Sequence, residues 1–174
     1  MILRPFSGDA FRVHRPKWAW LPASGEGAAS HGGRANRPGV PALYLALDQA
    51  TALAEYMQGS TLLQPGTIVQ YKVELGLVVD FSKGYDRDAG WEPLWEDFMC
   101  DWRKLLFNAH IEPPSWVLAD SVISANVKGI LFPSTQRAGG INLVVFTDLV
   151  GDSDVVAPHD PGGYLPANQS AWPA

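Results

Sequence analysis

The sequence predicts a single domain of the mixed α+β class, and three observations lead to that prediction. The chain has 174 residues, a length that suits one hydrophobic core. Hydrophobic residues make up 47% of it and charged residues 18%, which is the composition of a folded protein. Short strand patterns of period two are interspersed with helical patterns. We expect the domain in residues 1–150 and a tail rich in proline and glycine in 151–174.

The first third of the chain predicts two strands separated by a long loop. Residues 11–15 suit a short strand. The glycine-rich segment 17–39 has no sustained apolar period and is predicted to be a flexible loop. Its length is itself a hint of binding, because long loops are uncommon in compact domains. The apolar run 42–47 then predicts a buried strand.

A helix is expected directly after that strand. The carboxylate of Asp48 suits an N-cap because it can accept hydrogen bonds from the first free backbone NH groups. Apolar residues then recur at helical spacing and predict a stripe that faces the core. The stripe consists of Ala50, Leu53, Ala54 and Met57. Glu55 lies off this stripe, so we expect it to face a cleft or the solvent.

The remaining elements complete the α+β pattern. Alternation of apolar and polar residues predicts a half-buried strand at 67–75, and residues 77–81 are expected to pair nearby. Pro93 suits the first turn of a second core helix. The apolar residues of that helix would be Leu94, Trp95, Phe98, Trp102, Leu105 and Leu106. A third helix is predicted at 116–125, followed by short strands at 129–132 and 142–147.

Charge and cysteine content narrow the functional classes. The net charge of −5 is the wrong sign for direct binding to nucleic acid. Cys100 is the single cysteine, and the amino terminus lacks the apolar core of a secretory signal, so we expect a cytoplasmic protein. No uncharged apolar stretch is long enough to cross a bilayer.

Familiar catalytic motifs are missing from the sequence. The Gly-rich loop lacks the Gly-Lys-Ser/Thr ending of a P-loop and departs from the dinucleotide fingerprint. There is no Gly-x-Ser-x-Gly elbow of a serine hydrolase. The histidines and the cysteine are scattered without the spacing of paired metal ligands, so we expect no metal site.

Isolated polar residues next to apolar runs are the remaining candidates for chemistry. They are Arg12, Arg34, Tyr44, Glu55 and Ser134. Each also has an ordinary structural interpretation: a charge at a strand edge, a solvated loop residue, a core ring with a satisfied hydroxyl, an exposed helix face and a turn former. Singly, none of them indicates a function.

As an ordered set, the motifs around these residues resemble the RES-domain family. The matching segments are Phe11-Arg12-Val13, Gly32-Gly33-Arg34-Ala35-Asn36 with Gly39, Leu43-Tyr44-Leu45-Ala46, Ala54-Glu55 and Gly129-Ile130-Leu131-Phe132-Pro133-Ser134. Together they cover roughly residues 10 to 150. One departure is Ala35, where the family more often has tryptophan.

The resemblance implies a bacterial toxin of a toxin–antitoxin pair with a fold similar to ADP-ribosyltransferases. NAD would be its substrate, and its antitoxin would be an Xre-type helix-turn-helix protein. Cleavage of the nicotinamide–ribose bond needs a carboxylate near the ribose, cations on the diphosphate and an aromatic wall. Arg12 and Arg34 would clamp the diphosphate, and Glu55 would stabilise the oxocarbenium-like ribose. Tyr44 would stack on the nicotinamide, and Ser134 would hydrogen-bond the ribose or the amide.

Several functions stay open at this stage. The acceptor of ADP-ribose could be a cellular protein, or water or phosphate in an enzyme that depletes NAD. A catalytically idle module that only binds the antitoxin is the alternative from another class. A ribonuclease-type toxin is disfavoured by the acidic balance of the chain.

Overall fold

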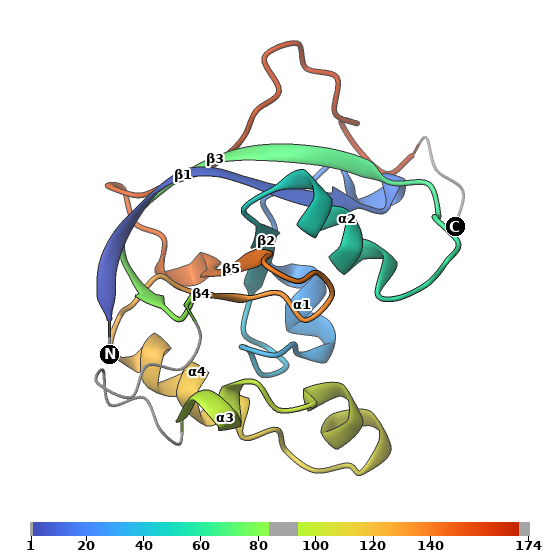
Figure 1. Ribbon diagram of the computed structural model, residues 1–174. Helices are drawn as coiled ribbons and strands as arrows, with labels where there is room; N and C mark the ends of the chain where they lie inside the picture. Colours follow the sequence, from blue (N-terminus) through green and yellow to red (C-terminus); the bar gives the residue numbers. More distant parts are fainter. Residues whose placement is uncertain (1, 84–93, 171–174) are drawn as a thin grey trace.

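The computed structural model describes residues 2–83 and 94–170, which fold into a six-stranded sheet with helices on its outer surface (Figure 1). The strands are β1 (Leu3–His14), β2 (Ala42–Ala46), β3 (Thr67–Asp80), β4 (Gly129–Pro133), β5 (Ile141–Phe146) and β6 (Val155–Pro158). The helices are α1 (Glu26–His31), α2 (Gln49–Met57), α3 (Leu94–Phe98) and α4 (Ser115–Ser124), with the 3₁₀ turns η1 (Pro16–Trp18) and η3 (Thr147–Leu149) and the π-helical turn η2 (Lys104–Asn108).

The sheet closes on itself. Its order is β1-β2-β5-β4-β3-β6, and β1 also pairs with β3 along most of its length, so the first five strands form a ring. Among the strand pairs of the described residues, β3–β4 alone is parallel. β1 meets β2 at a single register position, Phe11 opposite Ala46. Figure 1 shows the two long strands arching over the three short ones, which leaves β1 and β3 diverging from β2 and β5 at one end.

Two main apolar clusters lie on the two faces of this sheet. The inner cluster joins strands on opposite sides of the ring and includes Leu43, Tyr71, Leu131 and Leu143. The outer cluster packs the other face of β4 and β5 against α3 and α4, through residues such as Phe98, Leu118, Ile130 and Phe146. Because all these side chains are nearly inaccessible to solvent, the two clusters fix the frame that carries the candidate site.

The α+β fold class is confirmed, as are most of the predicted strands. Runs 42–47, 129–132 and 142–147 correspond to β2, β4 and β5. The alternation in 67–75 is also observed, because Val69, Tyr71, Val73 and Leu75 are all buried. β3 continues through the segment that was expected to pair beside it, so 67–75 and 77–81 belong to one long strand. The strand predicted at 11–15 is the end of the longer β1.

The prediction of a flexible loop at 17–39 is wrong. The segment contains η1 and α1, and hydrogen bonds within it and to its neighbours hold the rest. The glycines allow close contacts with the backbone, and these contacts leave no periodic pattern of apolar residues in the sequence. Gly33 is such a case: a Cβ there would lie 2.5 Å from the Tyr44 hydroxyl.

The predicted core stripe is only partly correct: Leu53 packs against the buried residues Val13, Ala46 and Ala52, but the most deeply buried face of α2 is a different one. Its buried residues are Thr51 and Ala52, whereas Ala50 is exposed. Asp48 caps the helix as predicted, and it also accepts a hydrogen bond from the Thr51 hydroxyl at 2.7 Å, so this polar side chain can be buried without losing a partner. Glu55 lies one turn after Thr51 and therefore faces the protein, not away from it.

The second core helix is interrupted. Instead of one helix there are α3 and, after a turn at residues 99–101, a second helical stretch in which Trp102 and Arg103 lead into η2. Pro93 lies outside the described residues. The helix predicted at 116–125 corresponds to α4.

The segment predicted as a tail contributes to the sheet. Residues Val155–Pro158 form β6, which pairs with the middle of β3, and the chain that follows projects beyond the long strands (Figure 1). None of the helices in the described ranges is long and apolar enough to span a membrane.

Candidate functional site

Tyr44 on β2 is the centre of a rigid loop–strand junction. Its hydroxyl donates a hydrogen bond to Asn36 Oδ1 at 2.8 Å and accepts one from the backbone NH of Ala35 at 2.9 Å. The amide of Asn36 in turn donates to the carbonyls of Ala28, Arg37 and Val40. Burial raises the pKa of Tyr44, so its hydroxyl stays protonated at neutral pH. The hydroxyl thus holds the loop, and the ring is the part of Tyr44 that could meet a ligand.

The loop that presents Arg34 is fixed from a second side by α4. The indole NH of Trp116 donates to the carbonyl of Gly33 at 2.7 Å. Arg37 forms ion pairs with Glu112 at 2.6 Å and with Asp120 at 2.7 Å. A loop held in this way can present a guanidinium in one position, which lowers the entropic cost of binding an anion.

Arg34 has one nitrogen in use and two available. Its Nη1 donates to the carbonyls of Phe98 at 2.7 Å and Cys100 at 2.9 Å, at the end of α3. Nε and Nη2 make no hydrogen bond with any of the described residues. Burial lowers the pKa of Arg34, although an arginine remains charged at neutral pH. The guanidinium is therefore oriented by the protein while keeping donors for a ligand.

Glu55 is held by two donors on the same oxygen. Oε1 accepts from Ser134 Oγ at 2.7 Å and from Asn142 Nδ2 at 2.6 Å. Ser134 Oγ also accepts from the backbone NH groups of Gln136 and Arg137, so its hydrogen-bonding capacity is filled. In the structure Ser134 therefore holds the carboxylate of Glu55, whereas the sequence predicted that Ser134 contacts the ligand directly. The second oxygen of Glu55, Oε2, makes no hydrogen bond within the described part of the chain.

Arg12 on β1 is a partly buried cation without a carboxylate. It makes no ion pair or hydrogen bond with the residues that the structure describes. Burial lowers its pKa, and the hydroxyls of Tyr71 and Tyr44 are close enough to act on it. A desolvated cation without a partner is unfavourable unless an anion joins it, which is a mark of an anion-binding site.

His14 lies two residues beyond Arg12 and is locked in its neutral form. Its Nε2 lies 2.6 Å from the Tyr71 hydroxyl, which donates to the carbonyl of Pro22 at 2.9 Å. Because the single hydroxyl proton goes to Pro22, Nε2 must be the donor in the His14–Tyr71 bond. Burial, and then the charge of Arg12, lower the pKa of His14 to about 3.

The five residues singled out in the sequence are linked to one another by one hydrogen bond and by the action of their charges. Ser134 contacts Glu55 directly, and the charge of Glu55 acts on the pKa of Arg34. Arg34 and Arg12 both act on the pKa of Tyr44. Of the other four residues, Arg12 is linked to Tyr44, through its charge and without a hydrogen bond.

Sequence reasoning missed two residues of this arrangement. Asn36 was quoted as part of a motif but given no role, and Asn142 was not singled out. Asn142 is 6% exposed, and its Oδ1 is buried without a hydrogen-bond partner in the described structure. A polar residue inside the otherwise apolar strand 142–146 was the signal that could have identified it.

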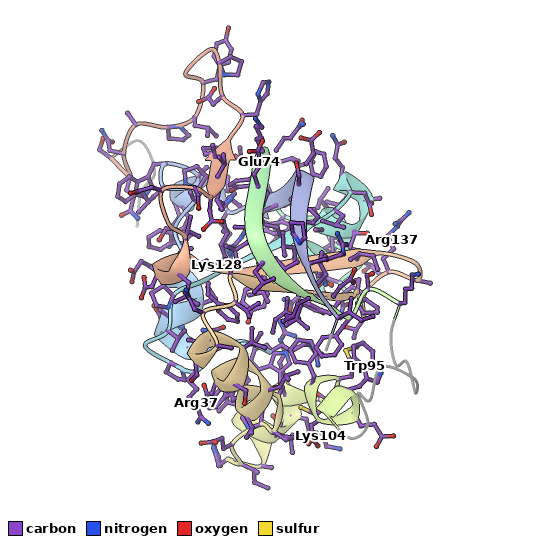
Figure 2. The ribbon with its side chains drawn as sticks, turned by 90° about the vertical axis from the view of Figure 1, so that its left-hand side faces the viewer. Arg37, Glu74, Trp95, Lys104, Lys128 and Arg137 are labelled. Atoms are coloured by element: carbon purple, nitrogen blue, oxygen red, sulfur yellow. The ribbon has the colours of Figure 1, made fainter. Side chains whose placement is uncertain are left out.

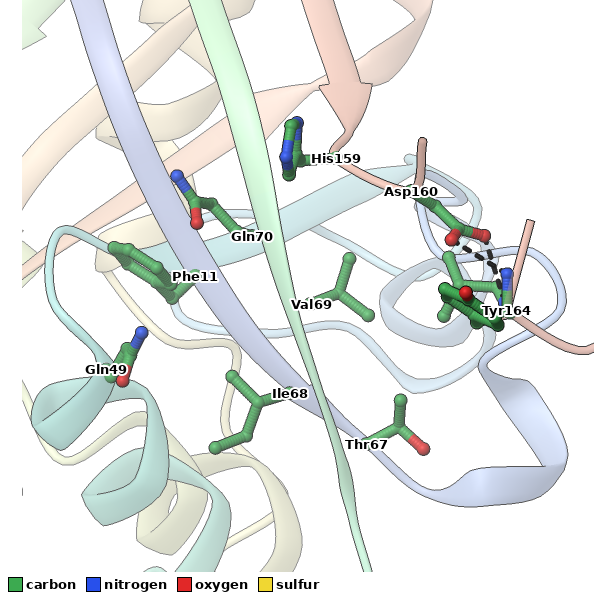
Figure 3. Close-up of a pocket in the computed structure, with 10 residues that line it drawn as sticks. Phe11, Gln49, Thr67, Ile68, Val69, Gln70, His159, Asp160 and Tyr164 are labelled. Atoms are coloured by element: carbon green, nitrogen blue, oxygen red, sulfur yellow. Dashed lines mark hydrogen bonds between the residues drawn. The ribbon is translucent and has the colours of Figure 1, made fainter. Parts of the chain in front are cut away.

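A groove on the surface of the long strands lies apart from these residues. It has a volume of about 480 Å³ and runs from Phe11 and Gln49 to the chain around Tyr164, with Ile68 in its floor (Figure 3). None of Arg12, Arg34, Tyr44, Glu55 and Ser134 lines it. The carboxylate of Asp160, which also lines this groove, accepts hydrogen bonds from the backbone NH groups of Tyr164 and Leu165. Within the described ranges, no group of three or more histidine, cysteine or acidic residues could hold a metal ion.

Comparison with known proteins gives a family and a fold. A family model described as the RES domain matches residues 9–165, which include β6. Among solved structures, the chain is similar to one from the crystal structure of the M. tuberculosis MbcT–MbcA toxin–antitoxin complex, with 20% sequence identity and a TM-score of 0.55. That match covers 88% of this chain and 83% of the other. No curated protein sequence was found to match the chain.

Proposed function

The chain belongs to the RES-domain family, and from this premise we propose that it is a toxin that cleaves NAD and transfers the ADP-ribosyl group to an acceptor. The observation that carries the proposal is the setting of Glu55. One oxygen is fixed by Ser134 and Asn142, while the other has no partner among the described residues. Such a carboxylate, near cations that lack carboxylate partners, suits a substrate with a diphosphate and a developing positive charge on a ribose.

Each part of the reaction has a corresponding group in this chain. The bond between the ribose C1′ and the nicotinamide nitrogen breaks, and nicotinamide leaves with the electron pair. The free oxygen of Glu55 stabilises the oxocarbenium-like ribose that remains. An acceptor then adds to C1′ and loses its proton. Arg12 and the two free nitrogens of Arg34 hold the diphosphate, since guanidinium groups bind phosphate oxygens in a bidentate manner.

The ring of Tyr44 provides an apolar wall for the nicotinamide. Its hydroxyl is occupied and its pKa is raised, so the proposal gives it no part in proton transfer. Ser134 and Asn142 position Glu55 and make no contact with the substrate. The proposed division is therefore two cations, one carboxylate and the ring of Tyr44 in contact with NAD, and two polar residues behind the carboxylate.

The proposed partner is an Xre-type helix-turn-helix antitoxin. Its support is the family membership, together with a structural neighbour that was determined as a toxin–antitoxin complex. Growth arrest that is relieved by the antitoxin is the expected cellular outcome.

The test is to incubate the purified protein with NAD and cell extract, with and without phosphate, and to follow free nicotinamide together with ADP-ribose on protein. Nicotinamide release with a labelled protein band indicates a protein ADP-ribosyltransferase. Release without label indicates NAD hydrolysis, or phosphorolysis where release depends on phosphate. No release from folded, antitoxin-free protein would contradict the proposal and favour a module that only binds the antitoxin.

Two matched variants assign the activity to the site. Glu55→Gln is expected to abolish nicotinamide release while antitoxin binding is kept, because the amide cannot stabilise a cation. Glu74→Gln is the control, since Glu74 forms a surface ion pair with Lys72 and lies in the middle of β3, away from η2 (Figure 2). Equal activity in both variants would remove Glu55 from the mechanism.

A further inference from the structure

The segment between α3 and η2 is attached directly to the candidate site. The carbonyls of Phe98 and Cys100 accept hydrogen bonds from Arg34 Nη1 at 2.7 and 2.9 Å. Phe98 is also completely buried in the outer core cluster. Because Arg34 and the core hold both sides of this turn, the residues that follow it have a fixed position relative to the site.

Arg103 projects from this turn on an aromatic support. Its guanidinium lies over the ring of Trp102, 4.4 Å from the ring centroid. Trp102 is 8% exposed, and its ring packs 6.0 Å from that of Phe107. A stacked guanidinium keeps its planar edge of NH donors free while its face is held. The π-helical turn η2 starts at the next residue, and such turns are rare and often occur at functional sites.

Arg103 also lacks an acidic partner, unlike several other arginines of the chain. Arg4, Arg37 and Arg137 each form an ion pair, whereas Arg103 forms none with the described residues. Its charge is near enough to lower the pKa of both Arg34 and Tyr44. Arg34 and Arg103 therefore repel each other. The charge of Glu55 also acts on Arg34, but no described carboxylate forms an ion pair with either arginine, so an anion bound by both would relieve the repulsion.

We propose that Arg103 is a further substrate-binding residue, which together with Arg34 binds the diphosphate of a dinucleotide. Trp102 holds its guanidinium in place, and the hydrogen bonds from Arg34 to Phe98 and Cys100 set the separation of the two cations. The dinucleotide part of this inference rests on the proposed function. The anion site itself does not, since it follows from the arrangement of the two arginines.

The test measures binding of two probes, inorganic pyrophosphate and ADP-ribose, by titration calorimetry. Arg103→Gln is expected to weaken both by about tenfold or more, because hydrogen bonds to charged groups contribute strongly to affinity. Lys104→Gln is the matched control: Lys104 is the adjacent exposed cation, is not among the charges that act on Arg34 or Tyr44, and should leave both affinities unchanged. Arg103 is exposed, so the variant should fold normally, and its thermal midpoint checks this.

The outcomes separate this inference from the proposed function. Equal affinities in wild type and Arg103→Gln would overturn the inference even if the protein cleaves NAD. Pyrophosphate binding that depends on Arg103, in a protein that does not cleave NAD, would uphold the anion site and contradict the proposed function. A wild-type protein that binds neither probe overturns the inference, and equal losses in Arg103→Gln and Lys104→Gln would reduce it to a general effect of net charge.

Discussion

Replacing Tyr44 with phenylalanine separates a structural role of the hydroxyl from a catalytic one. The ring and its packing are kept, and only the hydroxyl is lost. In the wild-type protein the hydroxyl accepts a hydrogen bond from the backbone NH of Ala35 at 2.9 Å and donates one to Asn36 Oδ1 at 2.8 Å. Ala35 is 0% and Asn36 is 1% exposed, so solvent does not replace the lost partner in this arrangement.

The magnitude follows from these two bonds. Leaving a buried donor or acceptor without a partner costs about 1–3 kcal/mol, and here one of each is affected. We therefore expect the free energy of unfolding to fall by about 3 kcal/mol. For a chain of this length that corresponds to a melting temperature lower by roughly 6–12 °C.

The assay is urea denaturation of the wild type, Tyr44→Phe and the control Tyr56→Phe. The Tyr56 hydroxyl donates to the Pro65 carbonyl at an exposed position, so its loss should cost about 1 kcal/mol or less. The slope of free energy against urea should be the same for all three proteins. Equal stability of the two variants would refute the structural role. Lost NAD cleavage at unchanged stability would show that the hydroxyl takes part in the chemistry.

Three further predictions test the site and its surroundings. Asn142→Leu should lower the rate of nicotinamide release at least about tenfold, because Glu55 loses a hydrogen-bond donor. The free energy of unfolding should change by less than about 1 kcal/mol, because the unpartnered Oδ1 of Asn142 is removed as well. A parallel loss of stability would contradict a positioning role. Gly33→Ala should destabilise the fold, since its Cβ would lie 2.5 Å from the Tyr44 hydroxyl and 2.6 Å from Asn36 Oδ1. A melting temperature equal to that of the wild type would show that the loop moves to accommodate the methyl group. The pKa of His14 is lowered to about 3 in the folded protein, whereas an unfolded histidine binds a proton near pH 6.5. The free energy of unfolding should therefore fall as the pH drops from 6.5 toward 3, by up to about 1.4 kcal/mol per pH unit. His14→Gln should make that part of the stability curve flatter, and an unchanged curve would exclude His14 as its origin.

Much of the sheet was predictable because local sequence pattern and final environment agree there. In β3 the alternation around Val69 and Tyr71 matches a strand with one buried face. In β4 and β5 continuous apolar runs match strands with core on both faces. Asp48 was a correct cap because capping depends on a few consecutive residues.

The errors occurred where distant contacts outweigh local pattern. Thr51 is buried in α2 because Asp48 satisfies its hydroxyl, so an apolar stripe was the wrong guide to the inner face. The segment 17–39 is ordered by hydrogen bonds to Tyr44, on the next strand, and to Trp116, which lies 83 residues beyond its partner Gly33. The second core helix is divided near Cys100, at the turn whose carbonyls Arg34 binds.

The sequence by itself determined the family to which the chain belongs and indicated five candidate site residues, because residue types and their order along the chain carry this information. Only the tertiary structure decided which groups remain available to a ligand. Hydrogen bonds that join different strands, helices and loops occupy the hydroxyls of Tyr44 and Ser134 and one nitrogen of Arg34. They leave one oxygen of Glu55 and the guanidinium of Arg12 without partners in the described structure. No local pattern encodes this distribution, since each of these bonds exists only once the strands and loops that carry its two ends have come together.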